Sequence, residues 1–373
     1  MPLRALARVN LAAVERNVAL LQRRLVGEAS LCAVVKGDGY GHGAVPAARA
    51  ALSAGARCLA VATAEEAAEL RSAGIGGRIL VMGAVSEVEL PVALAARADL
   101  VAWSERFVDD LNARTDAPVR VHVKLDSGMG RLGTRERREA LDVADRVIAA
   151  APALDLAGAM THFATADEDP EFLAVQLERF GPFAAALRRR RPDLAVHAAN
   201  SAATLRAPES HFDLVRCGIA IYGCDPMNED PSSHGLEPAL ELTSYVAAVK
   251  LARAGDSAGY GRRFIAQRDT WLATLPIGYA DGVRRALTNN GEVLISGRRY
   301  PIVGTVSMDN ITLDVGPGPL VRVGDVARII GADGAERQTA EELARRIGTI
   351  SYEVLCGISP RVPRVYHRDG APG

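Results

Sequence analysis

Lysine is scarce in this chain, and so are cysteine pairs and long apolar runs. Only three of the 44 basic residues are lysine, and the other 41 are arginine. No apolar stretch approaches the length of a membrane span, and the first residues lack the apolar core of a signal peptide. The net charge of −1 gives no electrostatic basis for binding nucleic acid. We therefore expect neither a membrane nor a nucleic acid as a partner.

Cysteine usage points to a reducing compartment. The chain has five cysteines, an odd number, and none forms a CxxC pair. This scatter is not typical of a disulfide framework or of a cysteine metal site, and it favours buried free thiols. We expect no metal, and the cytoplasm is the default location.

The first part of the chain alternates short apolar runs with helical patterns. Thr63 and Glu66 form the pattern of a capping box at the start of one helix, 63–72, and further helices are expected over 134–150 and 170–190. An amphipathic pattern also covers 9–21. The eight apolar runs are Leu31–Val35, Cys58–Ala62, Ile79–Met82, Leu100–Trp103, Val119–Leu125, Leu156–Met160, Leu194–His197 and Phe212–Cys217. Eight such repeats predict a (βα)8 barrel over residues 1–230, with an open doubly wound sheet as the alternative.

A mostly β domain is expected over residues 231–373. The stretch from Asp225 to Pro238 has the composition of a linker, and beyond it the hydrophobic pattern changes to period two. One amphipathic helix is expected over 339–347. The predicted strands are Leu242–Val249, Trp271–Pro276, Glu292–Ile295, Pro301–Val306, Ile311–Val315 and Val326–Ile330.

Lys36 ends the first apolar run and opens a glycine-rich turn. In a chain that uses arginine for nearly all its positive charge, a lysine at the end of a buried strand suggests chemistry that arginine cannot perform. A partly desolvated lysine can lose its proton and form a Schiff base. The alternative is a solvated strand end in a chain with a general arginine bias.

Polar groups follow several of the predicted barrel strands, where barrel enzymes carry their active sites. Each group alone is weak evidence, because a lone histidine or serine can have a purely structural role. Together they make a functional face. The groups are Lys36 and Tyr40, then 124–131, Thr161 with His162, Asn200 with Ser201, and Arg216 to Ile219.

The ends of the seventh and eighth strands offer a phosphate site. Ser201 supplies a hydroxyl before a short helix, and the turn at Gly218 and Ile219 supplies backbone amides. Barrels commonly bind phosphate at this place. A lysine that can form a Schiff base together with a phosphate cradle suggests pyridoxal 5′-phosphate as the cofactor.

With these residues in view, the chain resembles the alanine racemase family from about Val9 to Tyr366. The resemblance spans both predicted domains in order, so it is specific. The motifs that carry it are VKGDGYGHG from Val35, KLDSGMGRLG from Lys124, THFATAD from Thr161, ANSAAT from Ala199, VRCGIAIYG from Val215, GYGRRF from Gly259, LPIGYADG from Leu275, SMDN from Ser307 and SYE from Ser351.

The resemblance implies the catalytic roles. Lys36 would bind pyridoxal 5′-phosphate covalently and act as the base on one face of the substrate Cα. Tyr260, from the partner subunit of a homodimer with composite active sites, would act on the other face. Arg216 would contact the pyridine nitrogen of the cofactor, with His162 beside it. Arg131 and the partner subunit's Met308 would bind the substrate.

Further positions match family residues around these. Lys124 corresponds to a lysine that is carbamylated in some members. The cofactor-binding matches are Tyr40, His162, Asn200, Ser201, Gly218, Ile219 and Tyr352, and the supporting matches are Lys124, Tyr279 and Asp309. The implied activity is interconversion of L-alanine and D-alanine, which would supply D-alanine for the cell wall.

The chain departs from the family pattern at several positions. Gly37 and Gly39 stand where alanines are usual, and Ser307 stands where cysteine is frequent. Thr305 replaces an arginine found at the outer entrance in one member, which leaves substrate breadth open.

The alternatives are a broader racemase that also uses serine, a decarboxylase of the same architecture, a non-catalytic cofactor carrier and a lysine-dependent aldolase. Arg216, in place of an acidic residue, argues against decarboxylation.

Overall fold

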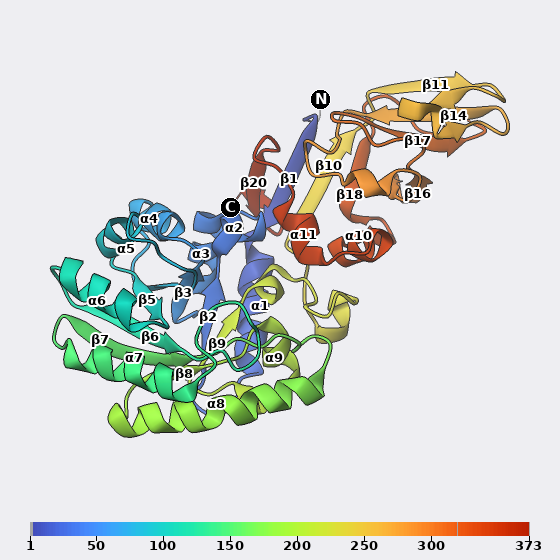
Figure 1. Cartoon of the computed structure of the whole chain (residues 1–373). Helices are drawn as coiled ribbons and strands as arrows, with labels where there is room; N and C mark the ends of the chain where they lie inside the picture. Colours follow the sequence, from blue (N-terminus) through green and yellow to red (C-terminus); the bar gives the residue numbers. More distant parts are fainter. Residues whose placement is uncertain (1–2, 319, 373) are drawn as a thin grey trace. The chain divides into compact units, whose positions relative to one another are not determined.

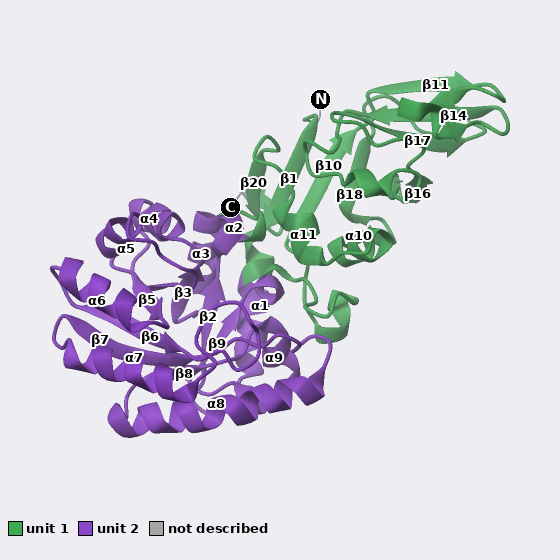
Figure 2. Ribbon diagram, in the orientation of Figure 1, with its two compact units in different colours: residues 1–14, 40–43, 222–373 green, residues 15–39, 44–221 purple. Residues whose placement is uncertain are grey.

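The computed structural model describes residues 3–318 and 320–372 (Figure 1). The chain forms two compact units, coloured separately in Figure 2. One unit comprises residues 15–39 and 44–221, and we call it the barrel unit. The other comprises residues 1–14, 40–43 and 222–373, and we call it the β unit.

The barrel unit contains eight parallel strands, as the sequence predicts. They pair in the order β8-β7-β6-β5-β4-β3-β2-β9. Hydrogen bonds from the amide of Asp213 to the carbonyl of Val196 (3.0 Å) and from the amide of Arg216 to that of Ala199 (2.9 Å) join the two end strands and close the ring. The strands are β2 (Ser30–Val34), β3 (Cys58–Val61), β4 (Arg78–Val81), β5 (Asp99–Ala102), β6 (Val119–Lys124), β7 (Leu154–Met160), β8 (Ala195–His197) and β9 (Leu214–Cys217).

Helices cover the outside of this ring (Figure 1). The predicted capping box is confirmed, since the hydroxyl of Thr63 accepts from the amide of Glu66 and the Glu66 carboxylate accepts from the amide of Thr63. The helix predicted over 170–190 has those bounds. The helices in this part of the chain are α1 (Leu11–Arg23), α3 (Ala44–Ser53), α4 (Ala64–Ser72), α5 (Leu90–Ala95), α6 (Glu105–Arg114), α7 (Arg137–Ala149), α8 (Pro170–Arg190) and α9 (Ser201–Arg206).

The interior of the barrel is more polar than a barrel core needs to be. Branched apolar residues usually fill this space. Here the buried side chains include those of His122 and Lys124 on β6, His197 on β8 and Arg216 on β9. Burying such groups costs free energy unless they are hydrogen-bonded, so their presence indicates a function.

The β unit is built on one large sheet and one small sheet. The large sheet has the order β16-β15-β18-β10-β1-β20-β21, with β19 paired to β18, and the small sheet has the order β11-β14-β17. Two short strands, β12 and β13, form a separate hairpin. The bounds are β1 (Ala5–Asn10), β10 (Leu240–Tyr245), β11 (Ala248–Ala252), β12 (Ser257–Ala258), β13 (Phe264–Ile265), β14 (Thr270–Leu275), β15 (Glu292–Ile295), β16 (Arg298–Pro301), β17 (Ile311–Gly316), β18 (Val326–Asp333), β19 (Glu336–Gln338), β20 (Arg364–Arg368) and β21 (Ala371–Pro372).

The amphipathic pattern over 9–21 is only partly helical. Val9 and Asn10 belong to β1, and the helix begins at Leu11. Along β1 the side chains of Ala5, Ala7 and Val9 are buried in alternation, because the strand pairs with β10 on one side and β20 on the other. Pairing with strands more than 200 residues away therefore determines that residues 5–10 form a strand rather than part of the helix.

Four other expectations for the β unit are wrong in detail. The run 242–249 divides into β10 and β11, which lie in different sheets. Residues 301–306 leave the strand after Pro301, and Gly304 takes a φ of 75°, which interrupts extended backbone. A second helix, α11 (Ser351–Cys356), follows the expected one, α10 (Ala340–Ile347). The proposed linker is packed rather than open, since Asp225, Pro231 and Leu236 within it are buried.

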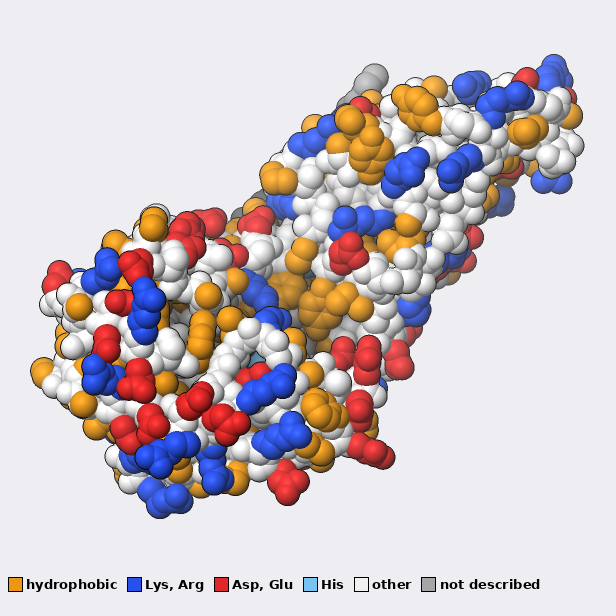
Figure 3. All heavy atoms as spheres, in the orientation of Figure 1, with side chains coloured by type: hydrophobic (Ala, Val, Ile, Leu, Met, Phe, Trp, Pro, Cys, Tyr) orange, Lys and Arg blue, Asp and Glu red, His pale blue; other side chains and the backbone are white. Residues whose placement is uncertain are grey.

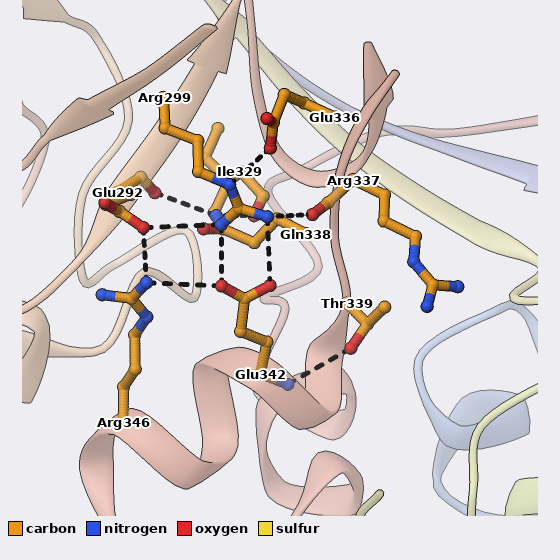
Figure 4. A network of polar contacts seen from close by, with 9 residues as sticks. All are labelled: Glu292, Arg299, Ile329, Glu336, Arg337, Gln338, Thr339, Glu342 and Arg346. Carbon is orange, nitrogen blue, oxygen red and sulfur yellow. Dashed lines mark hydrogen bonds and ion pairs between the residues drawn. The ribbon is translucent and has the colours of Figure 1, made fainter. Parts of the chain in front are cut away.

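An ion-pair network ties α10 to the large sheet (Figure 4). Arg299 on β16 donates to Glu336 (2.7 Å) and to Glu342 on α10 (2.7 Å), and it also lies near Glu292 on β15. Arg346 on α10 reaches Glu292 and Glu342 as well. Shared charges of this kind are more effective than isolated surface pairs. The network positions α10, against which α11 packs.

The surface of the molecule carries both signs of charge. On the face drawn in Figure 3, lysine and arginine side chains are interspersed with aspartate and glutamate. Among the described residues, no helix is both long and apolar enough to cross a membrane.

The capping box of α4 gives a first test. Replacing Thr63 by alanine removes the acceptor for the Glu66 amide, and we expect the free energy of unfolding to fall by about 1 kcal/mol. Urea denaturation followed by circular dichroism measures this. Thr63→Ser keeps the hydroxyl and is the control. Equal stability of the alanine variant and the wild type would contradict the capping role.

Candidate active site

Lys36 lies at the carboxyl end of β2, in a turn of unusual handedness. Gly37, Asp38 and Gly39 have φ values of 62°, 52° and 61°, which is the left-handed region. The amide of Gly39 donates to the carbonyl of Val35 (2.9 Å), which closes the turn. Glycine adopts this conformation without strain, whereas an L-residue with a side chain pays about 1–2 kcal/mol. The two glycines that depart from the family pattern therefore suit the turn that presents Lys36.

Arg216 on β9 is buried and held by four acceptors. One guanidinium nitrogen donates to Nδ1 of His197 (2.9 Å), and the other donates to the carbonyls of Thr161 (2.8 Å) and Ala198 (3.0 Å). The second nitrogen also lies 3.2 Å from Nδ1 of His162. Burial lowers the pKa of Arg216 to about 10, so the group remains a cation at neutral pH. The side chain is a fixed positive charge inside the barrel.

His162 follows β7 and is a neutral base in this environment. Burial lowers its pKa well below the usual value, and the positive charges of Arg216, Arg131, Lys124 and Lys36 lower it further. Because arginine can only donate, Nδ1 of His162 accepts and Nε2 carries the proton. The structure thus brings four predicted site residues together around this imidazole.

Lys124 ends β6 and is buried. Burial lowers its pKa to about 8, and the positive charges of Arg216 and Arg131 add to the effect, while Asp126 opposes it. A larger fraction of this amine is therefore neutral near pH 7 than for a surface lysine.

Asp126 organises the loop that leads to Arg131. Its carboxylate accepts from the amides of Gly128 (3.1 Å), Met129 (2.7 Å) and Gly130 (2.9 Å). Burial alone would raise the pKa of Asp126, but these amides and Arg135 lower it. The side chain of Arg131 is exposed at the end of this loop.

The predicted phosphate-binding residues at the ends of β8 and β9 have two different roles: Asn200 caps a helix, and Ser201 contacts the backbone amides of the turn at Gly218. Oδ1 of Asn200 accepts from the amide of Ala203 (3.0 Å), so this side chain caps α9. The hydroxyl of Ser201 accepts from the amides of Gly218 (3.0 Å) and Ala220 (3.4 Å). Ser201 and the turn at Gly218 and Ile219 thus meet at the carboxyl ends of β8 and β9.

In the β unit, Tyr40 and Tyr352 belong to an aromatic cluster. Their ring centroids lie 6.0 Å apart, and Tyr222 lies 5.3 Å from Tyr40. His42 stacks on Tyr222 at 4.4 Å, and its Nδ1 lies 3.0 Å from the carbonyl of Tyr40. Tyr222 and His42 were not singled out from the sequence, although both lie within the motifs.

The other predicted residues of the β unit lie on exposed loops. Tyr260 is 76% exposed, Met308 52% and Tyr279 43%. The hydroxyl of Thr305 donates to the carbonyl of Tyr260 (2.7 Å), and Thr305 is itself buried, so its side chain fixes the Tyr260 loop. Asp309 pairs with Arg361 (2.5 Å).

The loops of Tyr279 and Met308 approach each other closely. The amides of Tyr279 and Ala280 donate to the carbonyls of Ser307 (3.0 Å) and Met308 (3.1 Å). A side chain at Gly278 would collide with these carbonyls. Glycine therefore permits the contact that sets both loops.

Sequence reasoning missed His122, His197 and the buried carboxylate of Asp281. His122 had a usable signal, because the alternation in 119–124 places Arg120, His122 and Lys124 on one face of the strand. Asp281 lies in the motif LPIGYADG, but its partners Arg361 and Arg4, which donate to it, are far away in the sequence. Among the described residues, no group of His, Cys, Asp or Glu side chains could hold a metal ion.

These features define a class of protein: a barrel enzyme with a lysine at the end of its first barrel strand, a fixed buried arginine and a serine–amide cradle. Residues 9–226 match the family model for the alanine racemase N-terminal domain, and residues 239–366 match that for the C-terminal domain. The chain belongs to the alanine racemase family, a pyridoxal-phosphate-dependent family of isomerases.

Individual relatives agree with this assignment. Alanine racemase of Nostoc sp. is 40% identical, with 97% of this chain and 95% of the relative covered. The enzyme of Symbiobacterium thermophilum is 43% identical, with 96% of each covered. The crystal structure from D-cycloserine-producing Streptomyces lavendulae gives a TM-score of 0.94 at 39% identity and 98% coverage of each chain. That from Bacillus anthracis with bound L-Ala-P gives 0.90 at 38%, with 100% of this chain and 97% of that chain covered.

Asp126 gives a pH-dependent prediction. Its pKa is lower in the folded protein than in the unfolded chain, so its charge stabilises the fold above the unfolded pKa of about 3.9 and stops doing so as the pH falls through the folded pKa. We expect Asp126→Asn to reduce the free energy of unfolding by about 1 kcal/mol at pH 7 and by less at pH 3. Denaturation at both pH values measures this, and a difference that does not shrink would refute the charge argument.

Proposed function

We propose that this chain interconverts L-alanine and D-alanine with pyridoxal 5′-phosphate as cofactor, as a homodimer. The observation that carries the proposal is the buried cation of Arg216, fixed by four acceptors, in the same charge cluster as Lys36. A lysine together with a permanently charged arginine suits a lysine-linked cofactor whose ring nitrogen must remain unprotonated. An acidic partner would instead favour the protonated ring.

The residues present fit this cofactor. Lys36 would provide its covalent attachment, and Arg216 would donate to its pyridine nitrogen. The hydroxyl of Ser201 and the amides of the turn at Gly218 and Ile219 would bind its phosphate, a type of site that barrels use at this place. Tyr40 and Tyr352 would complete the phosphate contacts. When bound, the cofactor supplies an electron sink for the carbanion at the substrate Cα.

The protein itself has to move one proton on each face of that carbon. Lys36 would remove or return the proton on one face, and the phenol of Tyr260 from the partner subunit would do so on the other. His162, held as the Nε2–H tautomer by Arg216, can donate a hydrogen bond toward a phenolate without gaining a proton. Arg131, at the end of the Asp126 loop, would bind the substrate carboxylate.

The exposure of Tyr260, the proposed second base, and of its neighbours supports the proposed dimer. Tyr260, Tyr279 and Met308 are large side chains that lie exposed on one unit. Clustered exposed apolar side chains are typical of interaction sites. In the proposed dimer these loops complete the active site of the other subunit, with Met308 near the substrate and Asp309 supporting its loop through Arg361.

Lys124 is suited to carbamylation. The reaction joins a neutral amine to carbon dioxide and releases a proton, so it needs the neutral form that burial provides near pH 8. A carbamate would replace a buried cation beside Arg131 and Arg216 by an anion that pairs with Arg131. We propose this modification for Lys124.

The three lysines allow a matched test of the cofactor site. We expect the wild-type protein to have a visible absorption band that borohydride bleaches, and to form D-alanine from L-alanine. Lys36→Ala should lose the band and at least about 10³-fold of the racemase activity. Lys250→Ala, on exposed β11, is the control and should retain both. A band without D-alanine formation would redirect the search to serine or to decarboxylation, and no band after addition of the cofactor would refute the role of Lys36.

Tyr260→Phe separates the two bases. We expect racemisation to fall about 10²–10⁴-fold, because one face of the carbon loses its acid–base group. In deuterated water, exchange of the Cα proton should continue for the one alanine enantiomer whose proton faces Lys36. Proton NMR follows this exchange. Equal loss of exchange for both enantiomers would count against separate bases.

Carbamylation of Lys124 is tested by mass. We expect intact-protein mass spectrometry under non-denaturing, bicarbonate-containing conditions to show one added carbon dioxide, and Lys124→Ala to abolish the addition. Lys250→Ala should leave it in place. An addition that survives in Lys124→Ala would place the modification elsewhere.

A further inference from the structure

A chain of buried hydrogen bonds crosses the interior of the barrel behind Arg216. The guanidinium donates to Nδ1 of His197 (2.9 Å), and Nε2 of His197 lies 2.8 Å from Nδ1 of His122. Nε2 of His122 lies 3.5 Å from a carboxylate oxygen of Asp99. All four side chains are buried and come from β9, β8, β6 and β5.

The permanent charge of Arg216 sets the direction of this chain. Arginine has no acceptor, so Nδ1 of His197 must present its lone pair and Nε2 must carry the proton. Nε2–H of His197 then donates to Nδ1 of His122. Nε2–H of His122 has no hydrogen-bond partner among the described residues, and the nearest carboxylate, that of Asp99, lies 3.5 Å away. Burial and the neighbouring Arg216 and His122 hold the pKa of His197 well below its usual value, which agrees with a neutral imidazole.

A glycine makes the contact between the two rings possible. Strands β6 and β8 are not neighbours, because β7 lies between them. At the level of the rings, β7 carries Gly158, paired in register with His122 on one side and Ala195 on the other. A side chain at Gly158 would overlap the imidazole of His122. The rings meet across the space that glycine leaves.

Asp99, 3.5 Å from the far end of the chain, belongs to a salt-bridge network. Asp99 also pairs with Arg120 (3.3 Å), and Arg120 pairs with Asp155 (3.1 Å). Asp99, Arg120 and His122 line a cavity of about 720 Å³ at the amino ends of the strands. The hydrogen-bonded chain therefore runs from Arg216 through His197 to His122, and the carboxylate of Asp99 near its end is held by Arg120.

We propose that His197 and His122 are positioning residues for Arg216, and that Gly158 is required for their contact. The two imidazoles hold the guanidinium at one position and in one orientation, through tautomers that the chain itself imposes. The consequence for catalysis rests on the proposed function, in which Arg216 faces the cofactor. Supporting hydrogen bonds of this kind are what hold a functional group within a few tenths of an ångström.

The tautomers can be read in the protein without cofactor. We expect ¹⁵N-resolved histidine spectra to show His197 and His122 as neutral Nε2–H tautomers. Gly158→Ala should abolish the signature at both residues. Gly181→Ala is the matched control, because Gly181 lies in α8 and an added Cβ would meet no atom within 4 Å. Nδ1–H or rapidly averaged tautomers in the wild type would overturn the proposal, whatever the enzyme's activity.

Two substitutions at position 197 then separate positioning from packing, and they serve if Gly158→Ala does not fold. Asparagine can keep an acceptor for Arg216 but cannot reach His122, whereas alanine removes both contacts. We expect kcat to fall about 10-fold for His197→Asn and about 100-fold for His197→Ala, with KM little changed and the visible absorption band shifted in the alanine variant. Equal kcat values for both variants and the wild type, with an unshifted band, would overturn the proposal.

Discussion

The buried cation of Arg216 is the constraint on which the barrel interior depends. A guanidinium with no acceptor of its own has to be surrounded by acceptors. Strand β8 and the residues directly after β7 and β8 supply carbonyls and imidazole nitrogens for it. Burial is the main cause that lowers the pKa of His162, His197 and Lys124, and the charge of Arg216 lowers all three further. One permanent charge thus adds to the effect of burial at three neighbouring groups.

Glycine gives the second constraint. It permits left-handed backbone at some positions and leaves room for neighbouring groups at others. At Gly37 and Gly39 the left-handed backbone is what matters, since it turns the chain directly after Lys36. At Gly158 and Gly278 the missing side chain matters, because an imidazole or a neighbouring loop occupies its place. The positions of the site residues therefore depend on glycines without a side chain as well as on the strands that carry the site residues.

Much of this architecture follows from local sequence. The barrel strands are short apolar runs between amphipathic helices, and α4 and α8 begin at a cap or a proline that marks their start. Lys36, Ser201 and Arg216 stood out because each follows or ends such a run. β1 did not, because its partners β10 and β20 lie at the other end of the chain. The wrong prediction over 301–306 also reflects tertiary contacts. The amide of Val303 donates to the carbonyl of Thr312 on β17, whereas that of Val306 donates to the hydroxyl of Thr288.

The residues that sequence analysis missed share a property. His122, His197 and Asp281 matter through partners on other strands or loops. His122 and His197 stand in none of the motifs, and Asp281 lies in the motif from Leu275 without its partners being indicated there. His122 is visible as a polar residue in an alternating strand, but its role depends on Gly158, 36 residues further along the chain, leaving room for the ring of His197. A sequence motif can identify the residues that perform the chemistry. The residues that position them can be identified only once the closed barrel brings distant strands together. In this chain His122 and His197 are buried whereas Tyr260 is exposed, and the hydrogen-bond directions of the two imidazoles follow from Arg216.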